Sequence, residues 1–142
     1  MRLVWMMAAG AIGVLCRYEF TLGIQVWLNG RGARLAALVS LGPTFPLATM
    51  VINVLGSFLL AFLTTLALQS VVRPDLRVIL GTGFLGAFTT FSTFELESES
   101  LIARAQWWPA GCYIGGNLVL GFLAILAGRM LALRMFGPSA GF

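Results

Sequence analysis

Four stretches without a formal charge constrain the fold of this chain more than any other feature of its sequence. They are residues 3–16, 35–72, 78–94 and 105–128. A helix needs about 20 apolar residues to cross roughly 30 Å of hydrocarbon. The second and fourth stretches exceed that length, the third is slightly short, and the first reaches it only by continuing past Arg17. The pattern predicts helices that cross a membrane.

The composition excludes an ordinary soluble domain. Of the 142 residues, 59% are hydrophobic and 10% are charged, whereas soluble domains carry about 25% charge. The chain has no histidine, which excludes catalysis by imidazole, and its scattered charges do not suggest a nucleic-acid partner. We therefore predict one all-α membrane domain over residues 1–142, with no soluble domain. Its four expected spans lie near residues 3–28, 45–68, 78–102 and 108–133.

The arginines give only a weak prediction of orientation. With four spans, one side of the membrane carries five of them, Arg2, Arg73, Arg77, Arg129 and Arg134. The other side carries three, Arg31, Arg34 and Arg104. Basic loops favour the cytoplasmic side, but a difference this small leaves two alternatives. Either one orientation prevails by a small margin, or the chain inserts both ways and pairs with an inverted copy of itself.

The third expected span contains the most unusual polar pattern. Three glycines between residues 81 and 86 precede four hydroxyl residues and two phenylalanines between residues 89 and 94. Glycine lowers helix stability by about 1 kcal/mol relative to alanine, so the pattern predicts a break. Broken backbone at membrane depth must be buried in protein or line a wet cavity, and its freed carbonyls suit a small cation. The alternative is a small-residue face for helix packing.

Other polar residues lie inside or at the ends of the expected spans. Thr49, Asn53 and Ser57 are four apart and share a helix face, as do Tyr113 and Asn117. Hydrogen bonds between helices are the simplest role for these two sets.

Charged residues near the span ends have simpler expected roles. Arg17 either snorkels to the membrane surface or projects into a water-filled vestibule. The acidic residues that follow the third span are expected to form a solvated rim; they are Glu95, Glu97 and Glu99.

The order of these features resembles the Fluc (CrcB-type) fluoride channel family over essentially the whole chain. Residues 45–58 (FPLATMVINVLGSF) are similar to the second-span signature of that family, and residues 86–94 (GAFTTFSTF) are similar to its third-span signature. The resemblance implies an antiparallel, dual-topology homodimer of four-span chains, with a break in the third span and two pores. It implies a channel, not an enzyme, that exports fluoride passively across the bacterial inner membrane.

The resemblance also implies roles for individual residues. Asn53 would be a pore-lining amide with Thr49 beside it, Phe91 and Phe94 would turn their ring edges to the anion, and Tyr113 would be the pore tyrosine of the fourth span. Further polar pore residues would be Ser92, Thr93 and Asn117.

Other implied roles concern a cation and the pore mouth. Backbone carbonyls of Gly86 and Thr89 from both subunits would hold a structural Na⁺ at the dimer centre, and Arg17 would be the vestibule arginine. The partners would be fluoride, the bilayer and a second, inverted copy of the chain.

One departure from the family pattern affects the fourth span. Members often carry further serine or threonine there, but this chain has neither between Ser100 and Ser139. Asn117 is the candidate replacement.

The competing interpretation is a proton-coupled transporter of the small multidrug type, which also has four spans. It would use Glu19 as its proton-binding carboxylate.

Overall fold

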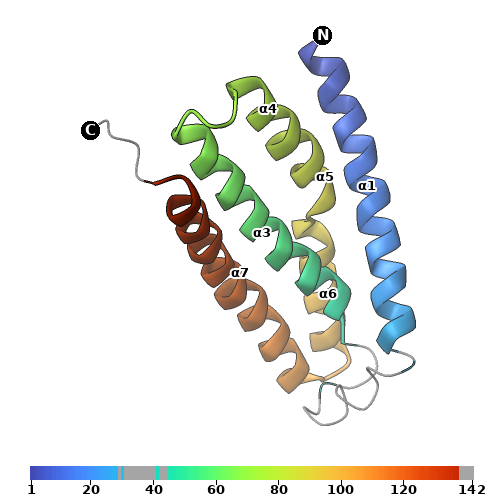
Figure 1. The fold of residues 1–142 in the computed structure, drawn as a ribbon. Helices are drawn as coiled ribbons and strands as arrows, with labels where there is room; N and C mark the ends of the chain where they lie inside the picture. The colour runs from blue at the N-terminus through green and yellow to red at the C-terminus, as the bar shows by residue number, and fades with distance from the viewer. Residues whose placement is uncertain (29, 31–40, 42–44, 138–142) are drawn as a thin grey trace.

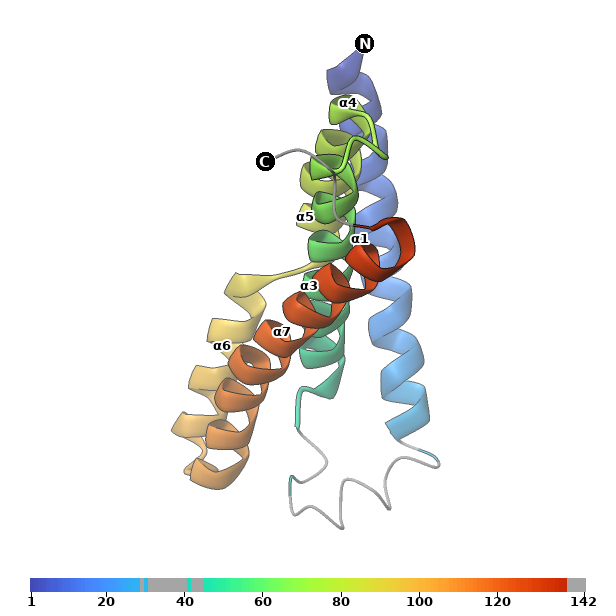
Figure 2. The ribbon, with the colours of Figure 1, turned by 60° about the vertical axis from the view of Figure 1, so that its left-hand side comes forward.

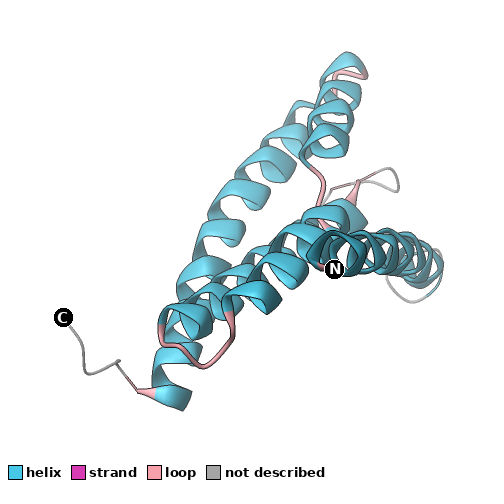
Figure 3. Ribbon diagram, turned by 90° about the horizontal axis from the view of Figure 1, so that it is seen from above, coloured by secondary structure: helices cyan, strands magenta, loops and turns pink. Residues whose placement is uncertain are grey.

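The computed structural model describes residues 1–28, 30, 41 and 45–137, and within these ranges the chain is helical apart from its connections (Figures 1 and 3). In this described part, three helices are long and apolar enough to cross a membrane: α1 (Arg2–Trp27), α3 (Leu47–Leu68) and α7 (Trp107–Phe136). The helical class is therefore as predicted. α7 ends three residues beyond the expected boundary, at Phe136. Arg31 and Arg34, used above to count charges, lie outside the described residues.

The third expected span is built from four short pieces. They are α4 (Pro74–Val78), the π-helical segment η2 (Ile79–Leu85), α5 (Gly86–Phe88) and α6 (Phe91–Ala103). α4 begins at Pro74, since proline lacks an N–H and fits the first helical turn. Thr89 (φ −83°, ψ 160°) and Thr90 (φ −150°, ψ 121°) between α5 and α6 are extended. The interruption predicted between residues 81 and 94 is thus found at these two threonines.

Figure 2 shows the consequence of this interruption: the chain leaves α5 in an extended step, and α6 is not collinear with α5. The pieces before the break pack against α1, chiefly through η2 and α5, whereas α6, after the break, packs against α7. The break therefore lets one segment contact α1 with its first half and α7 with its second half.

α3 and α7 form the most extensive helix pair, and they run in the same direction (Figure 1). Gly128 of α7 permits the close approach, because a Cβ added there would overlap the carbonyl of Phe58 on α3. Glycine at such a contact lets two helix backbones pack closely in a membrane.

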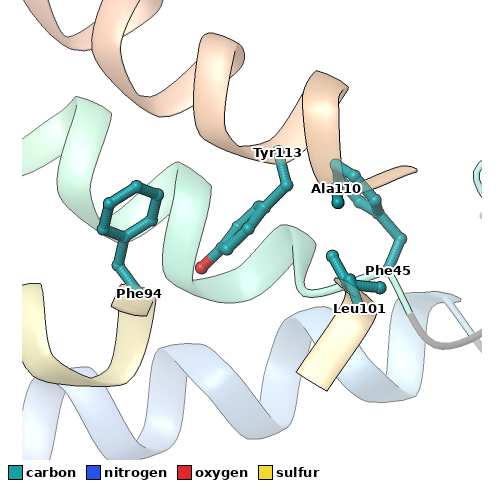
Figure 4. Packing of buried hydrophobic residues seen from close by; sticks show 5 residues of the cluster. All are labelled: Phe45, Phe94, Leu101, Ala110 and Tyr113. Atoms are coloured by element: carbon teal, nitrogen blue, oxygen red, sulfur yellow. The ribbon is translucent and has the colours of Figure 1, made fainter. Parts of the chain in front are cut away.

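A small core lies between the start of α3, the first two turns of α7 and the length of α6. It consists of Phe45, Phe94, Leu101, Ala110 and Tyr113, of which Tyr113 is completely buried (Figure 4). The outer faces are different: Leu15 on α1 and Phe122 on α7 are 63% and 61% exposed. Such exposed apolar faces are incompatible with water and suit lipid or another protein surface.

Candidate functional site

The side chain of Asn53 replaces the helical hydrogen bonds that Thr90 loses at the break. Its Nδ2 donates to the Thr90 carbonyl at 3.0 Å, and its Oδ1 accepts from the Thr90 N–H at 2.9 Å. Backbone groups freed at membrane depth need partners within the protein or in a wet cavity, and a buried polar group without a partner costs about 1–3 kcal/mol. Asn53 therefore stabilises the extended backbone by pairing both groups of one residue.

The threonines at the break end one helix and start the next. Thr89 donates from its N–H and its hydroxyl to the carbonyl of Leu85, at 3.0 and 2.9 Å. The Thr90 Oγ1 accepts from the N–H of Thr93 at 3.3 Å and lies 2.9 Å from the Thr93 hydroxyl. This places Thr90 at the N-cap of α6, a position that threonine favours because its side chain satisfies a free amide.

Two further residues hold Thr89 in place. The Nη1 of the half-buried Arg17 donates to the Thr89 carbonyl at 3.4 Å. Gly56 of α3 lies directly against the Thr89 side chain, where an added Cβ would overlap the threonine methyl group. Of the two alternatives for Arg17, the contact favours the inward position over snorkelling.

From the break, hydrogen bonds continue as a chain of polar groups, here called the polar chain: Thr90, Asn53, Asn117, Tyr113, Glu97 and Thr49. Asn53 donates to Asn117 Oδ1 at 3.4 Å, and Asn117 donates to the carbonyl of Tyr113 at 2.9 Å. The Tyr113 hydroxyl donates to Glu97 at 2.6 Å, and Thr49 donates to the other Glu97 oxygen at 3.1 Å. The polar chain thus contains four predicted site residues, and Glu97, which was not predicted, joins Tyr113 to Thr49.

Glu97 corrects the expectation of a solvated acidic rim. Glu95 and Glu99 are exposed, but Glu97 is half-buried and accepts from two hydroxyl groups. Its helical spacing gave a signal, because Glu97 is three residues after the buried Phe94 and four before the buried Leu101. With this pairing, the Thr49 and Tyr113 hydroxyls are directed to a carboxylate.

The aromatic residues gather beside the polar chain. The rings of Phe91 and Phe94 are 5.7 Å apart and tilted by 44°, and Phe94 lies 5.4 Å from the ring of Tyr113. Phe45 packs edge-on against Tyr113, so that the tyrosine ring lies between Phe45 and Phe94 (Figure 4). Phe94 is 8% exposed, whereas Phe91 is 68% exposed. The predicted aromatic pair therefore forms, with one ring uncovered in the single chain.

Two cavities lie along this arrangement. The inner cavity, of about 300 Å³, is bounded by α3, α7 and both sides of the break. Its lining includes Asn53, Ser57, Gly86, Thr89, Thr90, Phe91, Phe94 and Asn117. The outer cavity, of about 470 Å³, lies where α1 ends and α3 begins, beside α6. Its polar and charged lining residues are Thr21, Gln25, Thr49, Glu97, Ser100 and Arg104.

The predicted polar residues divide unevenly between these cavities. Thr49 lines the outer cavity, and Tyr113 lies between the two through its bond to Glu97. Ser92 is exposed on α6 and is absent from the lining of both cavities, and Thr93 is engaged with Thr90. Ser92 and Thr93 are therefore not brought to the cavities in the single chain.

The break also frees the two carbonyls predicted to hold Na⁺. In a continuous helix, Gly86 would accept from the N–H of Thr90, and Thr89 would accept from that of Thr93. Here the Thr90 N–H is directed to Asn53, and the Thr93 N–H is directed to the Thr90 side chain. Uncharged backbone oxygens released from a helix in this way suit a monovalent cation, and the Thr89 carbonyl already accepts from one cationic group, the Arg17 guanidinium.

Comparison with known proteins places this arrangement in a family. The profile described as "CrcB-like protein, Camphor Resistance (CrcB)" matches residues 4–129, which include the break and the polar chain. The chain belongs to the CrcB family. A relative from Hydrogenobaculum sp. (strain Y04AAS1) is 40% identical over 126 residues, or 88% of this chain and 92% of the relative.

Two other CrcB relatives cover even more of the chain. The protein of Acidobacterium capsulatum is 39% identical over 136 residues, covering 95% of this chain and 98% of the relative. That of Deinococcus radiodurans is 40% identical over 132 residues, covering 93% and 95%. All three relatives are named "Fluoride-specific ion channel FluC". The similarity therefore extends across nearly the full length of each protein.

If Asn53 holds the break, replacing it should expose the Thr90 amide. We expect Asn53→Leu, which keeps the side-chain size, to accelerate deuterium exchange in a peptide covering residues 89–94 by at least tenfold, measured by mass spectrometry in lipid nanodiscs. Asn117→Leu is the matched control, since it removes an amide from the polar chain but leaves both Asn53–Thr90 bonds. Equal exchange in Asn53→Leu and the unmodified chain would contradict this role.

Proposed function

We propose that this chain is a fluoride-selective channel through which fluoride leaves the cell passively, down its electrochemical gradient. Support comes from the names of its CrcB relatives and from their coverage of nearly the whole chain. The observation that carries the proposal is the polar chain, which starts at a break between two helical pieces and runs along aromatic rings to a second cavity. An apolar helix bundle has no need of such an array for packing alone.

Fluoride is small and strongly hydrated, so a pore must replace the donors of water. In the inner cavity the replacing donors would be the Ser57 hydroxyl and one amide hydrogen of Asn53. This is the hydrogen that Asn53 donates to Asn117 over 3.4 Å. The other amide hydrogen of Asn53 stays on Thr90. Aromatic rings carry a positive edge, so Phe91 and Phe94 would add weak contacts. Weak contacts suit conduction because an ion held too firmly does not leave.

Between the two cavities the anion meets Glu97. A carboxylate repels fluoride, but the hydroxyls of Thr49 and Tyr113 are directed to it. Fluoride would pass by taking one of these hydroxyls as its own donor while Glu97 keeps the other. In this account Glu97 orients the donors of the pore and limits how long the anion stays.

We further propose that residues 74–103 form the broken third of four spans, and that two chains pair in opposite orientations in the bacterial inner membrane. The weak arginine bias permits both insertions. The 68% exposure of Phe91 and the position of the inner cavity at the break fit a site completed by a second copy. Phe91 would then be covered on assembly.

We propose that the carbonyls of Gly86 and Thr89 hold a structural Na⁺ at the centre of this dimer, where the ion would replace the contact of the Thr89 carbonyl with Arg17. Such an ion would supply fixed positive charge near the anion path. Arg17, which donates to the Thr89 carbonyl, already brings one positive charge to the break.

A proton-coupled transporter that relies on Glu19 finds less support. Glu19 is exposed on α1 and takes no part in the polar chain, and the relatives carry a channel name.

Asn117, the candidate replacement for the serine or threonine that the fourth span lacks, joins Asn53 to Tyr113.

The direct test is fluoride efflux from liposomes that contain the purified chain and a cation ionophore to balance charge. We expect fluoride to be released and chloride to be retained, and we expect Phe91→Ile and Phe94→Ile each to slow fluoride release at least tenfold, because the ring edges are lost. Phe122→Ile, an exposed phenylalanine outside both cavities, is the matched control. Equal release of both anions, or full flux in both pore variants, would contradict the proposal.

The proposed inverted pairing is tested by labelling in intact spheroplasts. In a chain with Cys16→Ala and Cys112→Ala, single cysteines are placed in the loop after α3 (Val71→Cys) and at the end of α6 (Ala103→Cys), both exposed positions. A membrane-impermeant maleimide should label about half of each variant if both orientations occur. Full labelling of one position and none of the other would show a fixed orientation.

A further inference from the structure

The outer cavity contains two opposite charges on one face of α6. Glu97 and Arg104 both line it and are seven residues apart, which corresponds to roughly 10 Å along a helix axis. Glu97 lies toward the protein interior, bonded to Tyr113 and Thr49, whereas Arg104 is exposed at the C-cap of α6. The arginine therefore lies at the mouth of the cavity and the carboxylate lies at its inner end.

Arg104 has no side-chain partner among the described residues. By contrast, the guanidinium of Arg2 pairs with Asp75, and that of Arg17 donates to the Thr89 carbonyl. No ion pair or side-chain hydrogen bond between described residues involves Arg104. Its charge is thus available to a ligand in the cavity.

We propose that Arg104 forms an anion-capture site at the mouth of the outer cavity, where a small monovalent anion is held before it enters the pore. This inference rests on the proposed channel function and adds a residue that the sequence did not single out. Gln25 and Ser100, which line the same cavity, would supply neutral donors beside the guanidinium.

The need for such a site follows from Glu97. Without Arg104, the only formal charge among the described lining residues would be a carboxylate, which lowers the local concentration of anions. The Arg104 guanidinium makes the electrostatic potential at the mouth positive. A guanidinium is also less strongly hydrated than the ammonium group of lysine. Because Arg104 is exposed, its hold on an anion is weak and screened by salt. The site therefore concentrates anions without selecting among them.

The test measures fluoride efflux from liposomes at two ionic strengths set with an impermeant salt. At about 10 mM, where charges act over roughly 30 Å, we expect Arg104→Gln to reduce the initial rate about threefold. At about 300 mM the difference between the two rates should largely disappear, because salt then limits the reach of each charge to less than about 8 Å. Arg104→Lys should keep most of the rate, and Arg134→Gln, an exposed arginine on α7 outside both cavities, should behave as the unmodified chain.

Each other outcome has a definite meaning. No efflux from the unmodified chain would overturn the channel proposal itself. With that efflux present, an unchanged rate in Arg104→Gln at low ionic strength, or an equal loss at both ionic strengths, would overturn the capture site alone. If Arg104→Gln does not purify as a single species, Arg104→Cys in the cysteine-free chain replaces it. A positively charged thiol reagent should then raise the rate and a neutral one of similar size should not; equal effects would overturn the site.

Discussion

The hydrogen bonds between Asn53 and Thr90 are the interaction on which the rest of the structure depends. They satisfy both backbone groups of an extended residue from within the protein, as a break at membrane depth requires. Because Thr90 turns to Asn53, the carbonyl of Gly86 loses its helical partner and α6 starts in a new direction. That direction brings Phe94 and Glu97 against Tyr113. One amide on α3 thus determines where the cavities and the freed carbonyls lie.

Much of this was predictable from the sequence, because the constraints are local. Long charge-free stretches predict membrane helices, and glycines followed by four hydroxyl residues and two phenylalanines predict the break that is found at Thr89 and Thr90. The spacing of four between Thr49 and Asn53, and between Tyr113 and Asn117, predicts two polar faces, and these faces meet. Periodicity therefore identified most members of the polar chain.

The partners of these residues were not predictable, because they depend on how the helices pack. Asn53 was expected to offer its amide to an anion, but three of its four hydrogen-bonding positions serve Thr90 and Asn117. Glu97 was assigned to a solvated rim because it is one of three acidic residues at the end of the third span, although only one of the three faces Tyr113. Arg17 contacts a residue 72 positions away. Such long-range pairings follow from the tertiary arrangement and leave no local pattern.

The most direct test of the central claim is solid-state NMR of the chain labelled at residues 86–94 in lipid bilayers. The Cα and carbonyl chemical shifts of Thr89 and Thr90 should be those of extended backbone, between helical values at Phe88 and Phe94, and the Asn53 side-chain amide should correlate with the Thr90 carbonyl. Helical shifts at every residue from 86 to 94 would contradict the account, because a continuous helix would leave Asn53 without Thr90 and the polar chain without its beginning.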